Sequence, residues 1–238
     1  YNYTDSVMLG YWGQITETGW YNAALRIAMA GLIPMGFIGA SFYPALSKFS
    51  KESEEKFQKA WNQELEIMIL FSLPLVVGGW ALAQNIIYAF YPFDFFPSTF
   101  ALQILIFTAG LIFLYRPFND AMIVLNQQTK TFWITITGAA LNVVLNFILI
   151  PQYSLYGAAF ATVVTNVLVL LAIALAMKNL TFIRLPVLRI ALTFLTSAIA
   201  SAVMYLAIKQ ILLYNINIFI QVLTGAVVYF IVFFTIKK

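Results

Sequence analysis

The chain has 238 residues, 62% of them hydrophobic and 9% charged, with a net charge of +4 and a mean hydropathy of +0.88. A soluble domain of this length could not hide so much apolar surface in one core, so the composition predicts that lipid covers the remainder. The sequence lacks cysteine and histidine. This absence excludes disulfides, thiolate or imidazole metal sites and Ser–His catalysis, and we expect neither a metal nor another cofactor.

Seven apolar blocks are long enough to cross a bilayer, whose core of about 30 Å takes roughly 20 helical residues. They lie at about 19–47, 63–90, 98–126, 131–150, 154–177, 187–209 and 214–236. None alternates with the period of two that is typical of barrel strands, so the predicted fold class is all-α, a polytopic transmembrane helix bundle. Residues 1–10 are too short to span and lack an initiator Met. We interpret them as the end of a truncated first helix.

Lysine and arginine predict the orientation of the bundle. We take the connection 49–62 as cytoplasmic and let the helices cross the membrane alternately. Lys209 is then the one lysine or arginine of the connections that lies on the external side. The cytoplasmic cations are then Lys48, Lys51, Lys56, Lys59, Lys130, Lys178, Arg184, Arg189, Lys237 and Lys238. By the positive-inside rule, the C terminus is expected in the cytoplasm. We therefore assign the net positive charge to membrane orientation and expect no nucleic-acid partner.

The segment 49–66 carries an apolar helical stripe that includes Phe57 and Trp61. We interpret it as an amphipathic cytoplasmic elbow, a helix lying on the membrane surface before the chain turns inward. The carboxylates of this region, Glu64 among them, are assigned to the elbow and not to a converging pocket, which argues against enzymatic chemistry. On the opposite side, aromatic residues such as Tyr21 are expected to anchor the chain at the membrane interface.

Charged residues within the apolar blocks indicate a structural or functional role, because inserting each one into a membrane costs about 2.5–3.5 kcal/mol on insertion scales. Arg116 and Asp120 are four residues apart and can pair on one helical face, which also carries Asn119. Either this pair only orients helices, or Arg116 meets an anionic substrate group in a cavity. For Arg26, a clasp with Asp5 across the short external turn and a cavity-facing position are both compatible with the sequence.

The blocks 131–150 and 154–177 are expected to pack against each other through small and amide residues. Asn142 and Asn146 share a face with Gly138, and the second block offers Thr162 and other small residues. Small residues let helix backbones approach, and asparagine hydrogen-bonds across such a seam, so we favour packing over substrate contact. The last two blocks are almost purely apolar, and they either lie at the periphery or bound a groove for a lipid tail.

Several sequence runs occur together in a familiar order. They are Asp5-Ser-Val-Met-Leu-Gly10, Gly19-Trp-Tyr-Asn-Ala-Ala-Leu-Arg26, Tyr43-Pro-Ala-Leu-Ser47, Leu141-Asn-Val-Val-Leu-Asn146 and Tyr156-Gly-Ala-Ala-Phe-Ala-Thr162. This order resembles the C-terminal lobe of the polysaccharide or oligosaccharide flippases in the multidrug/oligosaccharidyl-lipid/polysaccharide (MOP) exporter superfamily. The resemblance covers about residues 1–178 through motifs and the last two helices only through helix count.

The resemblance implies a two-lobe transporter that moves undecaprenyl-pyrophosphate-linked oligosaccharide across the bacterial cytoplasmic membrane by alternating access. Residues 1–178 would be helices 7–12 of the second lobe and residues 179–238 helices 13 and 14. The implied partners are the lipid-linked substrate, membrane lipids and a missing N-terminal lobe. Arg26 and Arg116 are candidates to hold the pyrophosphate. Asp5 and Asp120 are candidate counter-charges or cation-coupling residues.

Four other functions are weighed against this one. A lipid II flippase for peptidoglycan shares the fold and the helix count. A cation-coupled multidrug antiporter needs acidic groups in its cavity, and this chain offers only Asp5 and Asp120 for that role. A membrane-embedded glycan enzyme usually carries a long external loop, and the external loops here are short. A non-transporting scaffold would reduce the polar faces to helix packing.

Overall fold

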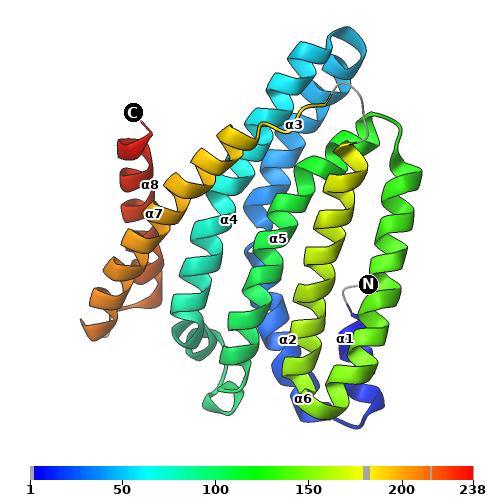
Figure 1. The fold of residues 1–238 in the computed structure, drawn as a ribbon. Coiled ribbons are helices and arrows are strands. Elements are labelled where there is room, and N and C mark those ends of the chain that lie inside the picture. The colour runs from blue at the N-terminus through cyan, green and yellow to red at the C-terminus, as the bar shows by residue number, and fades with distance from the viewer. Residues whose placement is uncertain (1–2, 179–182, 215, 238) are drawn as a thin grey trace.

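A computed structural model describes residues 3–178, 183–214 and 216–237 as an all-helical bundle (Figure 1). The α-helices are α1 Thr4–Tyr11, α2 Ile15–Ala30, α3 Ile33–Glu52, α4 Glu54–Phe90, α5 Ser98–Val124, α6 Gln128–Lys178, α7 Val187–Ile211 and α8 Ile218–Ile236. Two short 3₁₀ helices, η1 Phe93–Phe95 and η2 Leu212–Tyr214, lie in connections. The predicted all-α membrane bundle is confirmed.

Six helical segments of the described chain have the length and apolar composition needed to cross a membrane. One of them, α6, reverses direction at Ser154, whose φ of 54° and ψ of −135° are not helical. The two halves run antiparallel and side by side (Figure 1), with Gly138 packed on Val169 and Asn142 bonded to Thr162. The separate blocks predicted at 131–150 and 154–177 are thus the two arms of this hairpin.

The predicted block 19–47 is broken into α2 and α3 at Gly31 and Leu32. A side chain at Gly31 would meet Leu75 of α4 at 2.7 Å, so the glycine permits a close approach of the two helices. Pro34 follows in the first turn of α3, where its missing N–H costs no helical hydrogen bond. The break therefore has a local cause in the sequence.

The expected elbow at 49–66 is not a separate helix on the membrane surface. α3 ends at Glu52 and α4 then runs unbroken for 37 residues, or about 55 Å, from a start capped by the Ser53 hydroxyl. The apolar stripe is buried, because Phe57 and Trp61 are fully covered by protein. Since α4 is longer than a bilayer core of about 30 Å, its first turns extend beyond the apolar span.

One end of the bundle gathers the cationic connections, as the charge pattern predicts. The α3–α4 and α5–α6 connections, the end of α6 and the start of α7 all lie at the upper end in Figure 1. Gln58 exchanges two hydrogen bonds with the backbone of Arg184, at 2.8 and 2.9 Å. Glu66 pairs with Arg189 at 3.8 Å and with Lys237 at 3.2 Å. These contacts hold α4, α7 and α8 together at the cationic end.

The last two helices pack on α4, at the side of the bundle away from the α6 hairpin (Figure 1). Their buried contact residues include Met204 and Ile208 of α7 and Tyr229 and Phe233 of α8, which meet Leu82 of α4. The Tyr229 hydroxyl donates to the Leu70 carbonyl at 2.7 Å. The tyrosine hydroxyl is thereby satisfied within this contact.

Candidate functional site

Asp5 is the centre of a buried polar cluster that joins α1, α2 and both arms of α6. The side chains of Tyr21 and Thr162 donate to Oδ2 at 2.5 and 2.7 Å, and Asn146 donates to Oδ1 at 2.5 Å. Asn146 also donates to Asn142 at 3.1 Å, and Asn142 donates to Thr162 at 3.4 Å. Three donors on one carboxylate compensate much of the cost of burying its charge.

This cluster changes the interpretation of two residues. Tyr21 is completely buried and bonded to Asp5, so it is not the interfacial anchor that its aromatic neighbours suggest. Asn142 and Asn146 form the expected seam between the two arms of α6, and Asn146 also reaches Asp5. The polar face of the hairpin therefore serves both helix packing and the burial of one charge.

A small cavity of about 30 Å³ lies beside this cluster. Its wall includes the polar side chains of Asp5, Thr108, Asn142 and Thr162. The Thr108 hydroxyl is buried and has no hydrogen-bond partner among the described residues. A space of this size holds one water-sized species, and its polar wall consists of carboxylate, amide and hydroxyl groups.

Arg26 does not form the clasp with Asp5. The Asp5 carboxylate is bonded to neutral donors, and the Arg26 side chain is exposed on α2 without a hydrogen bond or ion pair to any described residue. The structure thus lacks the clasp, and the cavity-facing position of Arg26 stays a prediction.

Arg116 and Asp120 form the ion pair that their spacing predicts. Nε of the arginine lies 2.7 Å from Oδ2 of the aspartate, and the two side chains are 32% and 3% exposed. A methyl group added at Gly39 of α3 would lie 2.9 Å from the guanidinium, so this glycine makes room for it. Pro117 follows Arg116 directly in α5, and its backbone carbonyl accepts a hydrogen bond from the Trp61 indole N–H at 3.0 Å. The arginine thus keeps one side open while its counter-charge is buried.

Glu64 belongs to this second site, which the sequence interpretation missed. The acidic sequence around it predicts a place in the surface elbow, but the residue is 0% exposed on α4 and interacts electrostatically with Asp120 and Arg116. Neither of its carboxyl oxygens has a hydrogen-bond partner among the described residues. The sequence does contain a signal for the burial of Glu64, because this residue follows Trp61 by three positions and therefore shares its helical face.

Asn119 interacts with the neighbouring Asp120 carboxylate through its side chain and also faces an open groove. It accepts from the Tyr115 hydroxyl at 3.1 Å and lines an open groove between α5 and the first arm of α6. Threonine side chains line the same groove at Thr129, Thr131 and Thr135. Its wall is thus partly polar.

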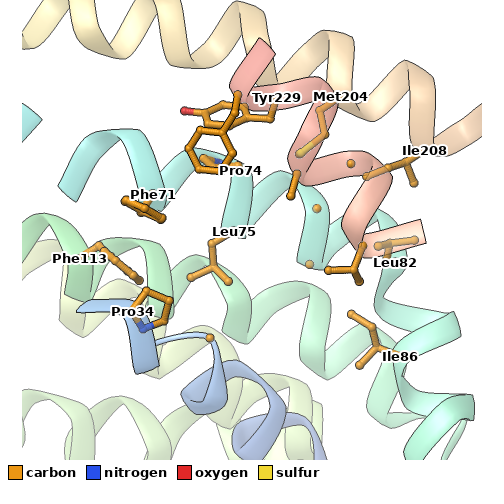
Figure 2. A pocket seen from close by; sticks show the side chains of 17 residues that line it. Pro34, Phe71, Pro74, Leu75, Leu82, Ile86, Phe113, Met204, Ile208 and Tyr229 are labelled. Atoms are coloured by element: carbon orange, nitrogen blue, oxygen red, sulfur yellow. The ribbon is translucent and has the colours of Figure 1, made fainter. Parts of the chain in front are cut away.

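A third feature is an apolar groove of about 370 Å³ between α3, α4, α5, α7 and α8 (Figure 2). Side chains such as Phe71, Leu75, Met204 and Ile208 point into it, and Gly78 and Gly79 of α4 also line it. Tyr229 lines the same groove, but its hydroxyl is bonded to a backbone carbonyl. This wall of α7 and α8 therefore suits a hydrocarbon chain and not a polar group.

No protein-family model matches the chain. Two curated relatives come from the archaeon Haloferax volcanii. "Probable flippase AglR" is 24% identical over 96% of this chain and 49% of its own length. "Probable low-salt glycan biosynthesis flippase Agl15" is 22% identical over 68% of this chain and 34% of its own length. The chain thus spans half or less of the curated relatives that it matches.

A solved structure has the same fold. It is the lipid II flippase MurJ in an inward closed conformation, with a TM-score of 0.73 and 21% identity over 91% of this chain and 46% of that one. The resemblance to flippases that the sequence motifs indicate is therefore confirmed. The helical arrangement of this chain is that of about half a MurJ molecule.

Proposed function

We propose that the protein containing this chain is a transporter that flips lipid-linked oligosaccharide across a cytoplasmic membrane by alternating access. The observation that carries the proposal is a flippase fold with a partly exposed arginine, Arg116, beside a buried counter-charge. An arginine can hold two phosphate oxygens at once, which suits the pyrophosphate of such a substrate. The function is transport, and no covalent step is required of the chain.

In this proposal, the chain forms the second of two lobes. Residues 1–178 make the core of the lobe, residues 179–238 add two helices, and the first lobe supplies the other cavity wall. The match to about half of AglR and of MurJ supports the assignment to one lobe. The cationic end of the bundle faces the cytoplasm, by the positive-inside rule, and the C terminus lies on that side.

Each candidate residue has a role that its surroundings support. Arg26 and Arg116 bind the anionic part of the substrate, because both guanidinium groups are accessible. Asp120 neutralises Arg116 when the cavity is empty. Asp5 is the candidate for cation coupling, since it borders a cavity of about 30 Å³ with a wall of oxygen-bearing side chains. The apolar groove along α7 and α8 shelters the lipid tail.

The test is complementation with the full-length protein in cells that lack a polysaccharide flippase. Surface glycan and accumulated lipid-linked oligosaccharide are measured at equal expression of wild type, Arg116→Ala and Arg189→Ala. Arg189 is the matched control, because it is also an arginine but pairs with Glu66 at the cationic end. We expect rescue by wild type and by the control and failure of Arg116→Ala. Equal rescue by all three would return Arg116 to a structural role.

A lipid II flippase is the second candidate function, and its support is the fold shared with MurJ. The curated relatives favour the first candidate, because one of them is named for glycan biosynthesis. Cells depleted of their lipid II flippase separate the two. Survival of these cells, with no rescue of the polysaccharide flippase mutant, would replace the first proposal with the second.

A further inference from the structure

The buried charges around Arg116 do not balance. Among the described residues, Glu64 and Asp120 contribute two carboxylates, and Arg116 contributes the one guanidinium within their range. α3 also packs here, but its residue beside Arg116 is Gly39, which brings no charge. Glu66 is on α4 too, but it is paired with Arg189 and Lys237 at the rim. If both buried carboxyl groups were ionised, the cluster would carry one uncompensated negative charge.

The surroundings of Glu64 make that charge costly. The residue is fully buried, and no described donor reaches either oxygen. Asp120, in contrast, accepts a charge-assisted bond of 2.7 Å from Arg116. A buried carboxylate without donors or a counter-ion costs many kcal/mol and normally takes up a proton instead. A metal cation is a less favourable way to neutralise Glu64 than a proton, because the positively charged Arg116 guanidinium in the same cluster repels it.

We propose that Glu64, Asp120 and Arg116 form a proton-binding site in which the two carboxyl groups share one proton at neutral pH. With that proton the cluster is neutral, because the remaining carboxylate balances the guanidinium. The proton belongs to the pair of acids, with Glu64 as its principal holder because Asp120 has the salt bridge.

In this site, the number of protons bound by Glu64 and Asp120 depends on which group Arg116 contacts. If the guanidinium leaves Asp120, the counter-charge is lost and the cluster binds a second proton. On the proposed function, Arg116 would leave Asp120 when it meets the pyrophosphate of the substrate, so substrate binding and proton uptake would be linked. That link rests on the proposed function, whereas the proton count of the resting protein does not.

Infrared spectroscopy of the purified full-length protein tests the site without any substrate. A protonated carboxyl group has a C=O stretch that is separate from the carboxylate bands, so difference spectra between variants count protonated acids. Relative to wild type at neutral pH, Glu64→Gln and Asp120→Asn each lose the signal of one protonated carboxyl group. Each leaves one acid to balance Arg116. Arg116→Gln gains the signal of one more.

Glu66→Gln is the matched control, because its carboxylate is accessible and paired with surface cations, and its spectrum keeps the full signal. Thermal unfolding of every variant verifies the fold, and Asp120→Asn supplies the test if Glu64→Gln does not fold. An unchanged protonated-acid signal in both carboxyl variants would overturn the proposal. Loss of the signal in Glu64→Gln alone would overturn the sharing of the proton with Asp120.

Discussion

Replacing Tyr21 by phenylalanine removes one hydroxyl group from the Asp5 cluster and leaves the ring in place. The hydroxyl donates to Oδ2 of Asp5 at 2.5 Å, and the tyrosine is completely buried. Hydrogen bonds to charged groups contribute about 1.5–3 kcal/mol, compared with about 0.5–1.5 kcal/mol for neutral pairs. We therefore expect Tyr21→Phe to lower the free energy of unfolding by about 1.5–3 kcal/mol.

Tyr229→Phe is the matched control. Its hydroxyl is also bonded in the protein interior, at 2.7 Å, but the acceptor is the neutral carbonyl of Leu70. Reversible unfolding in detergent micelles measures both variants and a double-mutant cycle of Tyr21→Phe with Asp5→Asn. The cycle should give a coupling energy of about 1 kcal/mol or more, because the two side chains are in direct contact. A coupling energy near zero, or a larger loss in Tyr229→Phe, would refute the assignment of this bond as charge-assisted.

Two further predictions concern helix contacts. Gly157→Ala should lower the melting temperature in detergent strongly, because the added methyl group would lie well inside the contact distance of the Leu149 carbonyl oxygen, a backbone atom. Gly19→Ala has open space around the new methyl group and should be neutral or stabilising by up to about 1 kcal/mol, so equal losses in both variants would contradict this explanation. Trp61→Phe removes the indole donor to the Pro117 carbonyl, at 3.0 Å, and should cost about 1–3 kcal/mol in the same unfolding assay. An unchanged free energy of unfolding would show that the bond makes no net contribution.

The sequence predicts the helices well because each one depends on local composition. An apolar run of about 20 residues fixes a membrane helix without reference to its neighbours. The Arg116–Asp120 pair was also predictable, since a spacing of four residues places both groups on one face of a helix. The turn at Ser154 agrees with the boundary between two predicted blocks.

Contacts across the fold were less predictable. The donors to Asp5 lie 16, 141 and 157 residues away along the chain, and no local pattern links them. The stripe at Phe57 and Trp61 was identified as apolar, but an amphipathic pattern does not reveal whether lipid or protein covers it. The position of Glu64 is less predictable for the same reason, because its burial and its charged neighbours on α5 come from the tertiary fold and not from the local sequence.

The Asp5 cluster has a mechanical consequence. α1 has only eight residues, yet Asp5 ties it to α2 and to both arms of the α6 hairpin. Sliding α1 along the hairpin would break several buried hydrogen bonds at once, so these elements should translate and rotate as one block. A bend within the bundle then falls elsewhere, and the interruption at Gly31 and Leu32, between α2 and α3, is a break in the helical backbone where it can occur.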